Sequence, residues 1–262
     1  MLTVLTSAKT APGATTSCTA LALAWPRPVL LADCDPAGGD IVPGLLPGRL
    51  VPDQGLLSWA AVSRGVPAVT AAGMFRENAV GLPERPHVWL LPGFMSVTQG
   101  YSFTSEVWER LASALEVCSA SVGVDSLVDA GRLASDRVPW PVLLAADAVV
   151  LTVRRSVRSI HAARTVVESL RFQLGDLSKV AVLVVGDSSD YTAGEVAAAL
   201  GLPLVGTLPE DRRTAKVLTE GGAAGDATLR RAPLLKEAAK VAAELIRAVD
   251  SPAQQARKAG RS

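Results

Sequence analysis

Short apolar runs that alternate with helix-length segments are the feature that most constrains the fold of this chain. The runs are Leu2–Thr6, Val29–Ala32, His87–Leu91, Ser126–Asp129, Ala148–Val153, Val180–Val185 and Leu204–Thr207. Runs of four to eight apolar residues in this alternation are typical of parallel strands that helices cover on both faces. The sequence therefore predicts an α/β fold with a doubly wound, mostly parallel sheet and helices on both faces.

Five helices are predicted between and after these strands. Their ranges are Thr15–Trp25, Ser105–Val117, Val157–Phe172, Thr192–Leu200 and Pro233–Val249. The last has apolar residues at helical spacing and is typical of a helix that covers a core. No Pro/Ser-rich linker or internal repeat interrupts the pattern, so we expect one domain over residues 1–250. Residues 251–262 lose the apolar periodicity and are predicted to form a disordered basic tail.

Composition excludes several classes of protein. With 49% apolar and 19% charged residues, the chain is not of the disordered type. The longest uncharged runs, residues 10–26 and 86–105, contain Pro and Gly, which argues against a membrane span. The N-terminus has no basic region of a secretory signal, no membrane-targeting helix is evident, and the 3 cysteines lack metal-ligand spacing. These features predict a cytoplasmic protein.

The first predicted strand leads through a loop of small residues into a helix, an arrangement that offers backbone N–H groups to an anion. The P-loop pattern G-x-x-x-x-G-K-[ST] fits it only in part. Ala8 stands at the first Gly, Gly13 at the second, Ala14 at the Lys, and Thr15 at the Mg²⁺ ligand. An ordinary turn between strand and helix is the alternative interpretation.

The loop from Ser7 to Thr16 resembles the deviant Walker A loop of the ParA/MinD family, K-G-G-x-G-K-[ST]-T, with Lys9 at the early Lys. Within that family it is most similar to the CpaE/TadZ branch, in which a small residue replaces the second Lys. The resemblance implies that the loop binds ATP. The residues implied are Lys9, Thr10, Ala11, Pro12, Gly13, Ala14, Thr15 and Thr16.

Two acidic motifs extend the resemblance. Val29–Asp40 is similar to the second strand and the D-x-D-P-x-G motif of the family, and Val124–Arg132 resembles its Walker B strand. The resemblance implies that Asp33 and Asp129 hold Mg²⁺ through water and that Thr15 is a metal ligand. It also implies that Asp35 positions the attacking water. The alternative for the first motif is a turn at the end of a strand, because Asp and Pro both favour turns.

The segments expected at the base of the nucleotide match the family less well. Val180–Asp187 replaces the strand that usually ends in an adenine-reading Asn, so Gly186 or Asp187 stands at that place. Gly201–Arg212 resembles the stretch whose loop lines the base, and this implies that Pro209 and Asp211 lie in the binding site.

The resemblance implies a nucleotide switch with ATP and Mg²⁺ as cofactors. The early Lys of the family reaches the phosphates of the partner protomer, so Lys9 and Asp35 are the implied catalytic residues and a homodimer across the nucleotide face is expected. Ala14 removes a charge-assisted contact worth about 1.5–3 kcal/mol, which predicts weak or no ATP hydrolysis. We expect such a switch to position a larger bacterial assembly together with an unknown protein partner.

Two alternatives stay open. One is a nucleotide-independent pseudo-ATPase that serves as a scaffold, which Ala14 and Asp187 favour. The other is a segregation ATPase that binds DNA without sequence specificity. The basic residues that could contact DNA are Arg154, Arg155, Arg158, Arg164 and Arg171. The DNA-binding hypothesis is less favoured, because aromatic stacking residues are missing from this segment and the net charge of residues 151–262 is only +5.

Overall fold

The computed structural model describes residues 1–8, 13–48, 53–133, 137–187, 190–222 and 226–251. The strands are β1 (Leu2–Ser7), β2 (Val29–Asp33), β3 (Val80–Leu82), β4 (Arg85–Leu91), β5 (Asp125–Arg132), β6 (Ala148–Arg154), β7 (Val180–Val185) and β8 (Leu204–Leu208). The helices are α1 (Ala14–Ala24), α2 (Val42–Leu45), α3 (Leu56–Val62), α4 (Ala68–Gly73), α5 (Phe75–Asn78), α6 (Val97–Gly100), α7 (Ser105–Val117), the π-helix η1 (Cys118–Val122), α8 (Trp140–Ala145), α9 (Val157–Leu174), α10 (Ala193–Leu200), α11 (Arg212–Glu220), α12 (Asp226–Arg231) and α13 (Pro233–Val249).

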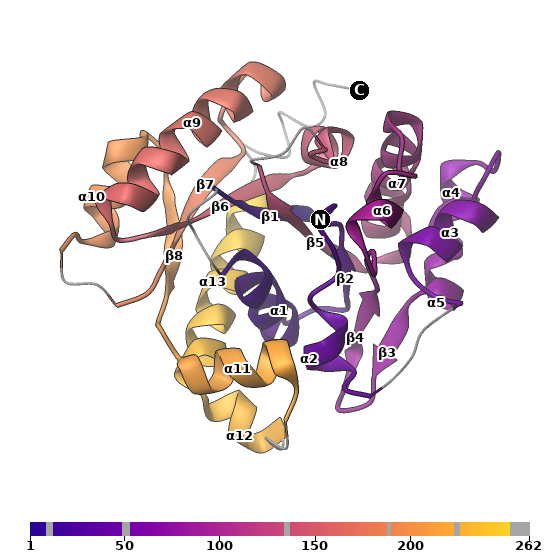
Figure 1. Cartoon of the computed structure of the whole chain (residues 1–262), viewed down its shortest axis with the longest axis horizontal. Coiled ribbons are helices and arrows are strands. Elements are labelled where there is room, and N and C mark those ends of the chain that lie inside the picture. Colours follow the sequence, from indigo (N-terminus) through magenta and orange to yellow (C-terminus); the bar gives the residue numbers. More distant parts are fainter. Residues whose placement is uncertain (9–12, 49–52, 134–136, 188–189, 223–225, 252–262) are drawn as a thin grey trace.

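The strands form an eight-stranded sheet in the order β3-β4-β2-β5-β1-β6-β7-β8 (Figure 1). All neighbouring strands run parallel except β3, which pairs with β4 in antiparallel fashion. The predicted doubly wound, mostly parallel sheet is therefore confirmed.

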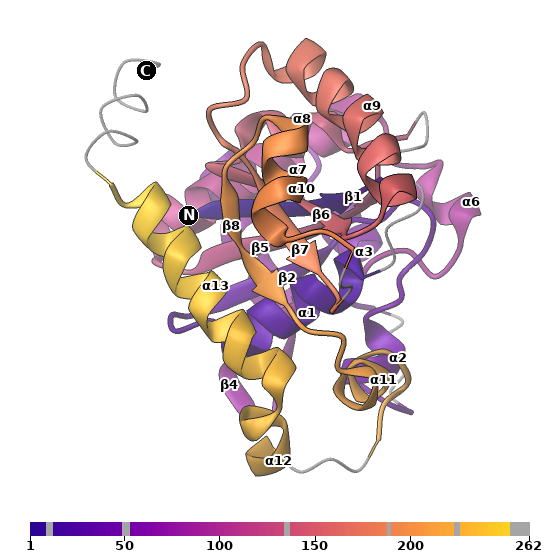
Figure 2. The same cartoon turned by 90° about the vertical axis from the view of Figure 1, so that its left-hand side faces the viewer.

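Helices cover the sheet on both faces, as Figures 1 and 2 show. One apolar core contains side chains of α7, α8, α9 and α10, together with those of α3, α4 and α5. The other contains side chains of α1, α11 and α13. Strand residues alternate between the two cores: Leu2 and Val4 of β1 belong to the first and Leu5 to the second. This alternation explains why nearly every residue of β1, β2, β5 and β6 is buried.

The order of the strands marks where a ligand crevice is expected, at the carboxyl ends of the strands. From β1 the chain crosses to β2 and β4 on one side of the sheet, returns through β5, and continues on the other side with β6, β7 and β8. In open α/β sheets, ligands bind beyond the carboxyl ends of the strands where the direction of winding changes. That point lies here at β1 and its neighbours β5 and β6.

Each predicted strand and helix is present in the structure, with bounds that differ by at most three residues at either end. The sequence did not predict β3 or several of the helices, among them α2, α5 and α6, which have four residues each. Elements of three or four residues are too short to show a period of 2.0 or 3.6 residues. Within the described residues, no helix is both long enough and apolar enough to cross a membrane.

A close contact between α2 and α11 gives a first prediction. Gly44 is buried in α2, and a Cβ atom on it would overlap the backbone carbonyl of Leu218 in α11. We expect Gly44→Ala to lower the free energy of unfolding by about 1–3 kcal/mol, the usual cost of overpacking. Thermal or urea unfolding measures this loss.

Gly73→Ala is the matched control. Gly73 also lies in a helix, α4, but a Cβ atom there would meet nothing within 4 Å. Because Ala has the higher helix propensity, the control should unfold at the same temperature as wild type or slightly higher. Equal unfolding temperatures for Gly44→Ala and Gly73→Ala would contradict the described packing of α2 on α11.

Candidate functional site

The predicted acidic residues meet at the carboxyl ends of β2 and β5. These parallel strands pair with Asp33 directly opposite Asp129, although 96 positions separate the two residues in the sequence. On its other side, Asp129 is opposite Leu5 of β1, three residues before the loop that leads to α1. The register of the sheet therefore places both carboxyl groups beside the predicted phosphate loop.

Both carboxyl groups are buried and only half satisfied. Asp33 is 1% exposed and Asp129 is 0% exposed. The Oδ1 atom of Asp33 accepts a long hydrogen bond from the N–H of Asp35 at 3.5 Å, and that of Asp129 accepts one from the N–H of Gly131 at 3.0 Å. The Oδ2 atom of each has no hydrogen-bond partner in the described part of the chain. Buried carboxylate oxygens without a partner are costly, so this pair requires a proton or a cation.

The pKa values of the pair also indicate that it requires a proton or a cation. Burial and the neighbouring charges of Asp129 and Asp35 raise the pKa of Asp33 well above its ordinary value. Burial likewise raises the pKa of Asp129 to about 6, although hydrogen bonds from Thr15 and from the Gly131 N–H oppose this. A hydrated divalent cation would relieve the repulsion between two such carboxylates. The residues present thus fit the Mg²⁺ that the sequence analysis implies.

A complete protein cage for a metal is not part of this arrangement. Across the described ranges, no group of three or more His, Cys, Asp or Glu side chains could hold a metal ion. Mg²⁺ commonly keeps several waters and is bound through one or two carboxylates plus the phosphates of a nucleotide. Asp33, Asp129 and the half-buried Thr15 match that incomplete type of site.

Asp35 is held in a tight turn beside the buried pair. Its Oδ1 atom accepts a hydrogen bond from the N–H of Ala37 at 2.8 Å, and burial raises the pKa of its half-buried carboxyl group. Gly131 faces it with φ +62°, and a Cβ atom there would overlap the Asp35 carboxyl group. Gly93 approaches the neighbouring carboxyl group in the same way, since its Cβ atom would lie 2.7 Å from Cγ of Asp33. Glycine at these places lets the backbone close around the two acids.

The glycine contacts were not found from the sequence. Gly93 directly follows β4 and Pro92, and Gly131 follows the predicted Walker B acid by two positions. The sequence signal for these contacts is a glycine near the end of a strand, but this signal does not identify the side chain that the glycine will contact.

The phosphate loop is described from Gly13 onward. Gly13 caps the start of α1 with φ +119°, a conformation that favours glycine, and its carbonyl oxygen accepts the N–H of Ser17 at 2.8 Å. No side chain caps α1 within the described residues, so the first N–H groups of the helix have no side-chain acceptor. Ala14 is buried and Thr15 and Thr16 are half-buried. Lys9, Thr10, Ala11 and Pro12 lie outside the described residues.

The residues predicted at the base form a small connected group. Oδ2 of Asp187, after β7, accepts the backbone N–H of Glu210 at 3.0 Å, and so joins β7 to the half-buried loop at Pro209. Asp211 caps α11: its Oδ1 accepts the N–H of Thr214 at 3.0 Å and its Oδ2 the hydroxyl of Thr214 at 2.7 Å. The structure brings the three predicted residues together, but both carboxyl groups already bind protein groups. Their contact with a base remains a prediction.

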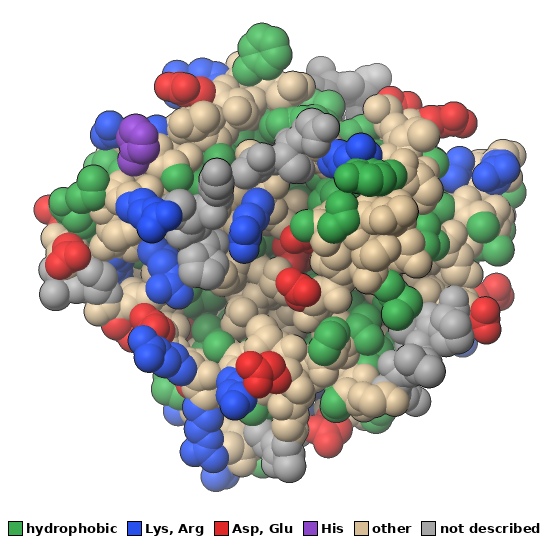
Figure 3. Space-filling model, in the orientation of Figure 1, with side chains coloured by type: hydrophobic (Ala, Val, Ile, Leu, Met, Phe, Trp, Pro, Cys, Tyr) green, Lys and Arg blue, Asp and Glu red, His purple; other side chains and the backbone are tan. Residues whose placement is uncertain are grey.

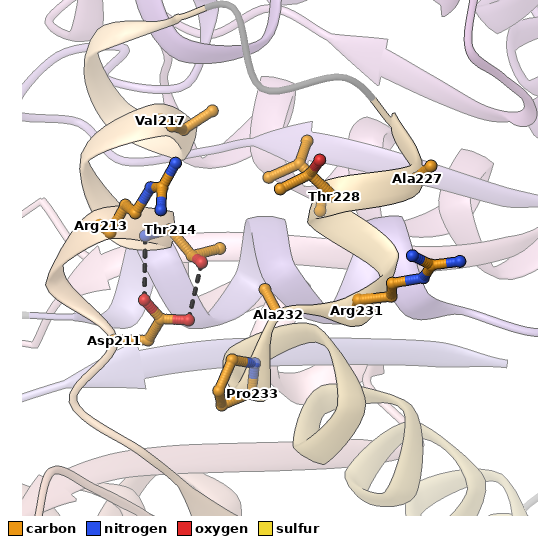
Figure 4. A pocket seen from close by; sticks show the side chains of 10 residues that line it. Asp211, Arg213, Thr214, Val217, Ala227, Thr228, Arg231, Ala232 and Pro233 are labelled. Atoms are coloured by element: carbon orange, nitrogen blue, oxygen red, sulfur yellow. Dashed lines mark hydrogen bonds between the residues drawn. The ribbon is translucent and has the colours of Figure 1, made fainter.

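Figure 4 shows the surroundings of Asp211. The residue borders a cavity of about 420 Å³ between α11, α12 and the start of α13, with Arg213, Thr228 and Arg231 among its lining residues. Hydrogen bonds from Thr214 outweigh the effect of burial and lower the pKa of Asp211. The Asp211 carboxylate thus accepts its hydrogen bonds from the first turn of α11.

The acid pair gives a prediction about stability and pH. A raised folded-state pKa means that the folded protein holds a proton which the unfolded chain releases. Stability therefore falls as pH rises from about 4 through about 6. We expect Asp129→Asn to stabilise the nucleotide-free protein at pH 7.5 by up to about 3 kcal/mol, and to lose this advantage near pH 4. Unfolding temperatures measured across this pH range test it.

Asp53→Asn, at an exposed position before α3, should change the unfolding temperature little at either pH. A variant Asp129→Asn that is less stable than wild type at pH 7.5 would show that the buried carboxylate is not repelled in the folded protein.

Comparison with known proteins places the fold. No family model matches the chain, and no curated protein sequence matches it. Among solved structures, the MinD cell division protein of Aquifex aeolicus has a TM-score of 0.68 at 20% identity, over 94% of this chain and 96% of that one. A ParA family ATPase from Chlorobium tepidum has a TM-score of 0.74 at 17% identity, over 92% and 98%.

A third structure is the septum site-determining protein MinD from Pyrococcus horikoshii in complex with Mg-ADP. It has a TM-score of 0.69 at 16% identity and covers 96% of each chain. The likeness runs along almost the whole length of all three proteins. The chain therefore has the fold of the MinD and ParA P-loop ATPases.

Proposed function

We propose that this chain is a ParA/MinD-like ATP-binding protein of the CpaE/TadZ type, whose Walker A loop is degenerate. It acts as a nucleotide-dependent dimeric switch with weak or no ATP hydrolysis, and it positions a larger bacterial assembly. The observation that carries the proposal is the buried Asp33–Asp129 pair, with unpartnered Oδ2 atoms, beside Thr15 at the start of α1. A sheet without a ligand site would have little reason to bury two facing carboxyl groups at its carboxyl edge.

The proposal assigns a role to each predicted site residue. The N–H groups at the start of α1, from Gly13 to Thr16, would bind the phosphates together with Lys9, Thr10, Ala11 and Pro12. Thr15, Asp33 and Asp129 would hold Mg²⁺ and its waters, and Asp35 would orient the attacking water. Mg²⁺ would neutralise charge on the phosphates. Asp187, Pro209 and Asp211 border the base.

Hydrolysis is expected to be slow for an electrostatic reason. The buried Ala14 stands where the P-loop lysine would be, so the charge that develops on the phosphates in the transition state lacks one cation. Binding depends less on that cation, because the loop N–H groups and the acid-bound metal contribute in the ground state as well.

A dimer across the nucleotide face is supported by the surface next to Asp35. Met95, Val97 and Tyr101, on and beside α6, are exposed by 79%, 47% and 53%. The segment lies against the Asp35 loop, since a Cβ atom on Gly100 would be 2.7 Å from the carbonyl oxygen of Pro36. Exposed apolar side chains beside a ligand site are typical of protein contact surfaces.

Calorimetry with Mg-ATP tests nucleotide binding. We expect wild type to bind, and Thr15→Ala to bind at least about tenfold more weakly, a loss of about 1.4 kcal/mol, because the variant removes the proposed metal ligand. Lys236→Ala, an exposed position on α13, is the control and should bind as wild type does. If wild type fails to bind at about 1 mM ATP, the alternative of a nucleotide-independent scaffold is the better one. A phosphate-release assay then distinguishes weak hydrolysis from none.

The dimer has a separate test. Light scattering should show wild type doubling its mass when Mg-ATP is added, and Lys9→Ala remaining a monomer, because the partner protomer's phosphates lose a cation. Lys236→Ala should still dimerise. A Lys9→Ala variant that dimerises fully with Mg-ATP would remove Lys9 from the interface, and a mass unchanged for wild type would contradict the dimeric switch.

DNA binding stays an alternative for the basic segment that begins at the end of β6. Arg158, Arg164 and Arg171 lie along α9 and their side chains are exposed. If duplex DNA bound to the ATP-loaded protein and dissociated steeply with salt, the segregation ATPase would be favoured.

A further inference from the structure

Arg154, the last residue of β6, pairs with a β7 residue that lies beside the start of α1. In the sheet, Arg154 is directly opposite Val185 of β7. A Cβ atom on Gly13, which caps α1, would lie 3.6 Å from Cγ1 of Val185. Neighbouring strands are about 4.8 Å apart, so an arginine side chain on β6 is long enough to reach past Val185 to the helix start.

The alternation along β6 directs this side chain to the correct face. Val149, Leu151 and Val153 belong to the core beneath α7–α10, whereas Ala148 and Val150 belong to the core that contains α1 and α13. Arg154 has the same parity as Ala148 and Val150, and therefore points to the α1 face. Arg155, whose Nε atom is also buried and without a hydrogen-bond partner in the described part of the chain, lies beyond the end of β6, so the alternation along the strand does not place it.

Arg154 is also short of partners. Its Nε atom is buried and has no hydrogen-bond partner among the described residues, while the residue as a whole is half-buried at the crevice. A buried guanidinium N–H without an acceptor is unfavourable unless a ligand supplies one.

The charges around it leave the guanidinium available. A hydrogen bond and the charge of Arg212 lower the pKa of Glu210, and the charge of Arg154 contributes after them. Glu210 itself pairs with Arg212 at 2.9 Å. Arg154 is thus near the loop at Pro209, but the cation that pairs with Glu210 of this loop is Arg212. In Figure 3, Lys and Arg side chains gather between α9 and the middle of the face, and acidic ones lie near its centre.

We infer that Arg154 binds the phosphates of the nucleotide and replaces, from β6, the positive charge that Ala14 leaves out of the loop. This inference rests on the proposed function, because it assigns a contact within the same site. An arginine suits the task, since its planar guanidinium forms two parallel hydrogen bonds to a phosphate. The residue is a binding residue that the loop pattern does not include.

The experiment compares Mg-ADP and Mg-ATP binding by calorimetry in wild type, Arg154→Gln and Arg154→Lys, with Arg171→Gln as control. Arg171 is exposed near the far end of α9. We expect Arg154→Gln to weaken binding of both nucleotides about 10- to 100-fold, Arg154→Lys to recover part of the loss, and the control to match wild type. Arg154→Gln should also bind with a weaker dependence on salt, because one phosphate contact by a cation is gone.

The unfolding temperature of each variant separates a contact from a structural role. The inference expects Arg154→Gln to unfold within a few degrees of wild type while it loses affinity. Two outcomes would overturn the inference and leave the proposed function intact. In the first, wild type and Arg154→Gln bind Mg-ADP with equal affinity and equal salt dependence. In the second, Arg154→Lys loses as much nucleotide affinity as Arg154→Gln, and both variants unfold far below the unfolding temperature of wild type. If wild type binds neither nucleotide, the proposed function fails first and the inference fails with it.

Discussion

The pairing of β2 with β5 that sets Asp33 opposite Asp129 is the constraint on which the candidate site depends. Two carboxyl groups in the interior of a protein repel each other and lose hydration, and both effects raise their pKa values. The protein keeps this arrangement at the carboxyl edge of its sheet, where α1 begins. A cation and a phosphate chain would satisfy the acids and the helix N-terminus together, so the contacts that are unfavourable within the protein alone favour a metal-bound nucleotide.

Close backbone contacts hold the acids in place. Gly131 and Gly93 approach Asp35 and Asp33 so closely that a Cβ atom at either position would overlap or nearly overlap a carboxyl group. The turn at Asp35 is joined in turn to α6 through the contact of Gly100 with Pro36. The turn at Asp35 therefore lies in contact with the segment that carries the exposed apolar residues beside α6, the surface proposed for the second protomer.

The arginines after β6 divide into two groups once the strand parity is known. Arg158, Arg164 and Arg171 lie exposed along α9, on the helix layer opposite α1. Arg154 points to the α1 face and has a buried Nε atom without a partner. Sequence position alone gathers them into one basic segment, and that segment suggested DNA. Their placement in the sheet favours different roles, with the phosphate contact assigned only to Arg154.

Seven of the eight described strands, the helices α1, α7, α9, α10 and α13, and the motifs at Gly13, Asp33 and Asp129 were predicted from the sequence, because buried parallel strands and amphipathic helices leave a periodic pattern of apolar residues. The strand β3 and most of the other helices are too short to show such a pattern. Tertiary structure alone decided that Asp33 faces Asp129, that glycines close over the acids, and that Asp187 accepts the N–H of Glu210. These are contacts between residues far apart in the chain. They depend on strand register and side-chain direction, which local sequence does not encode.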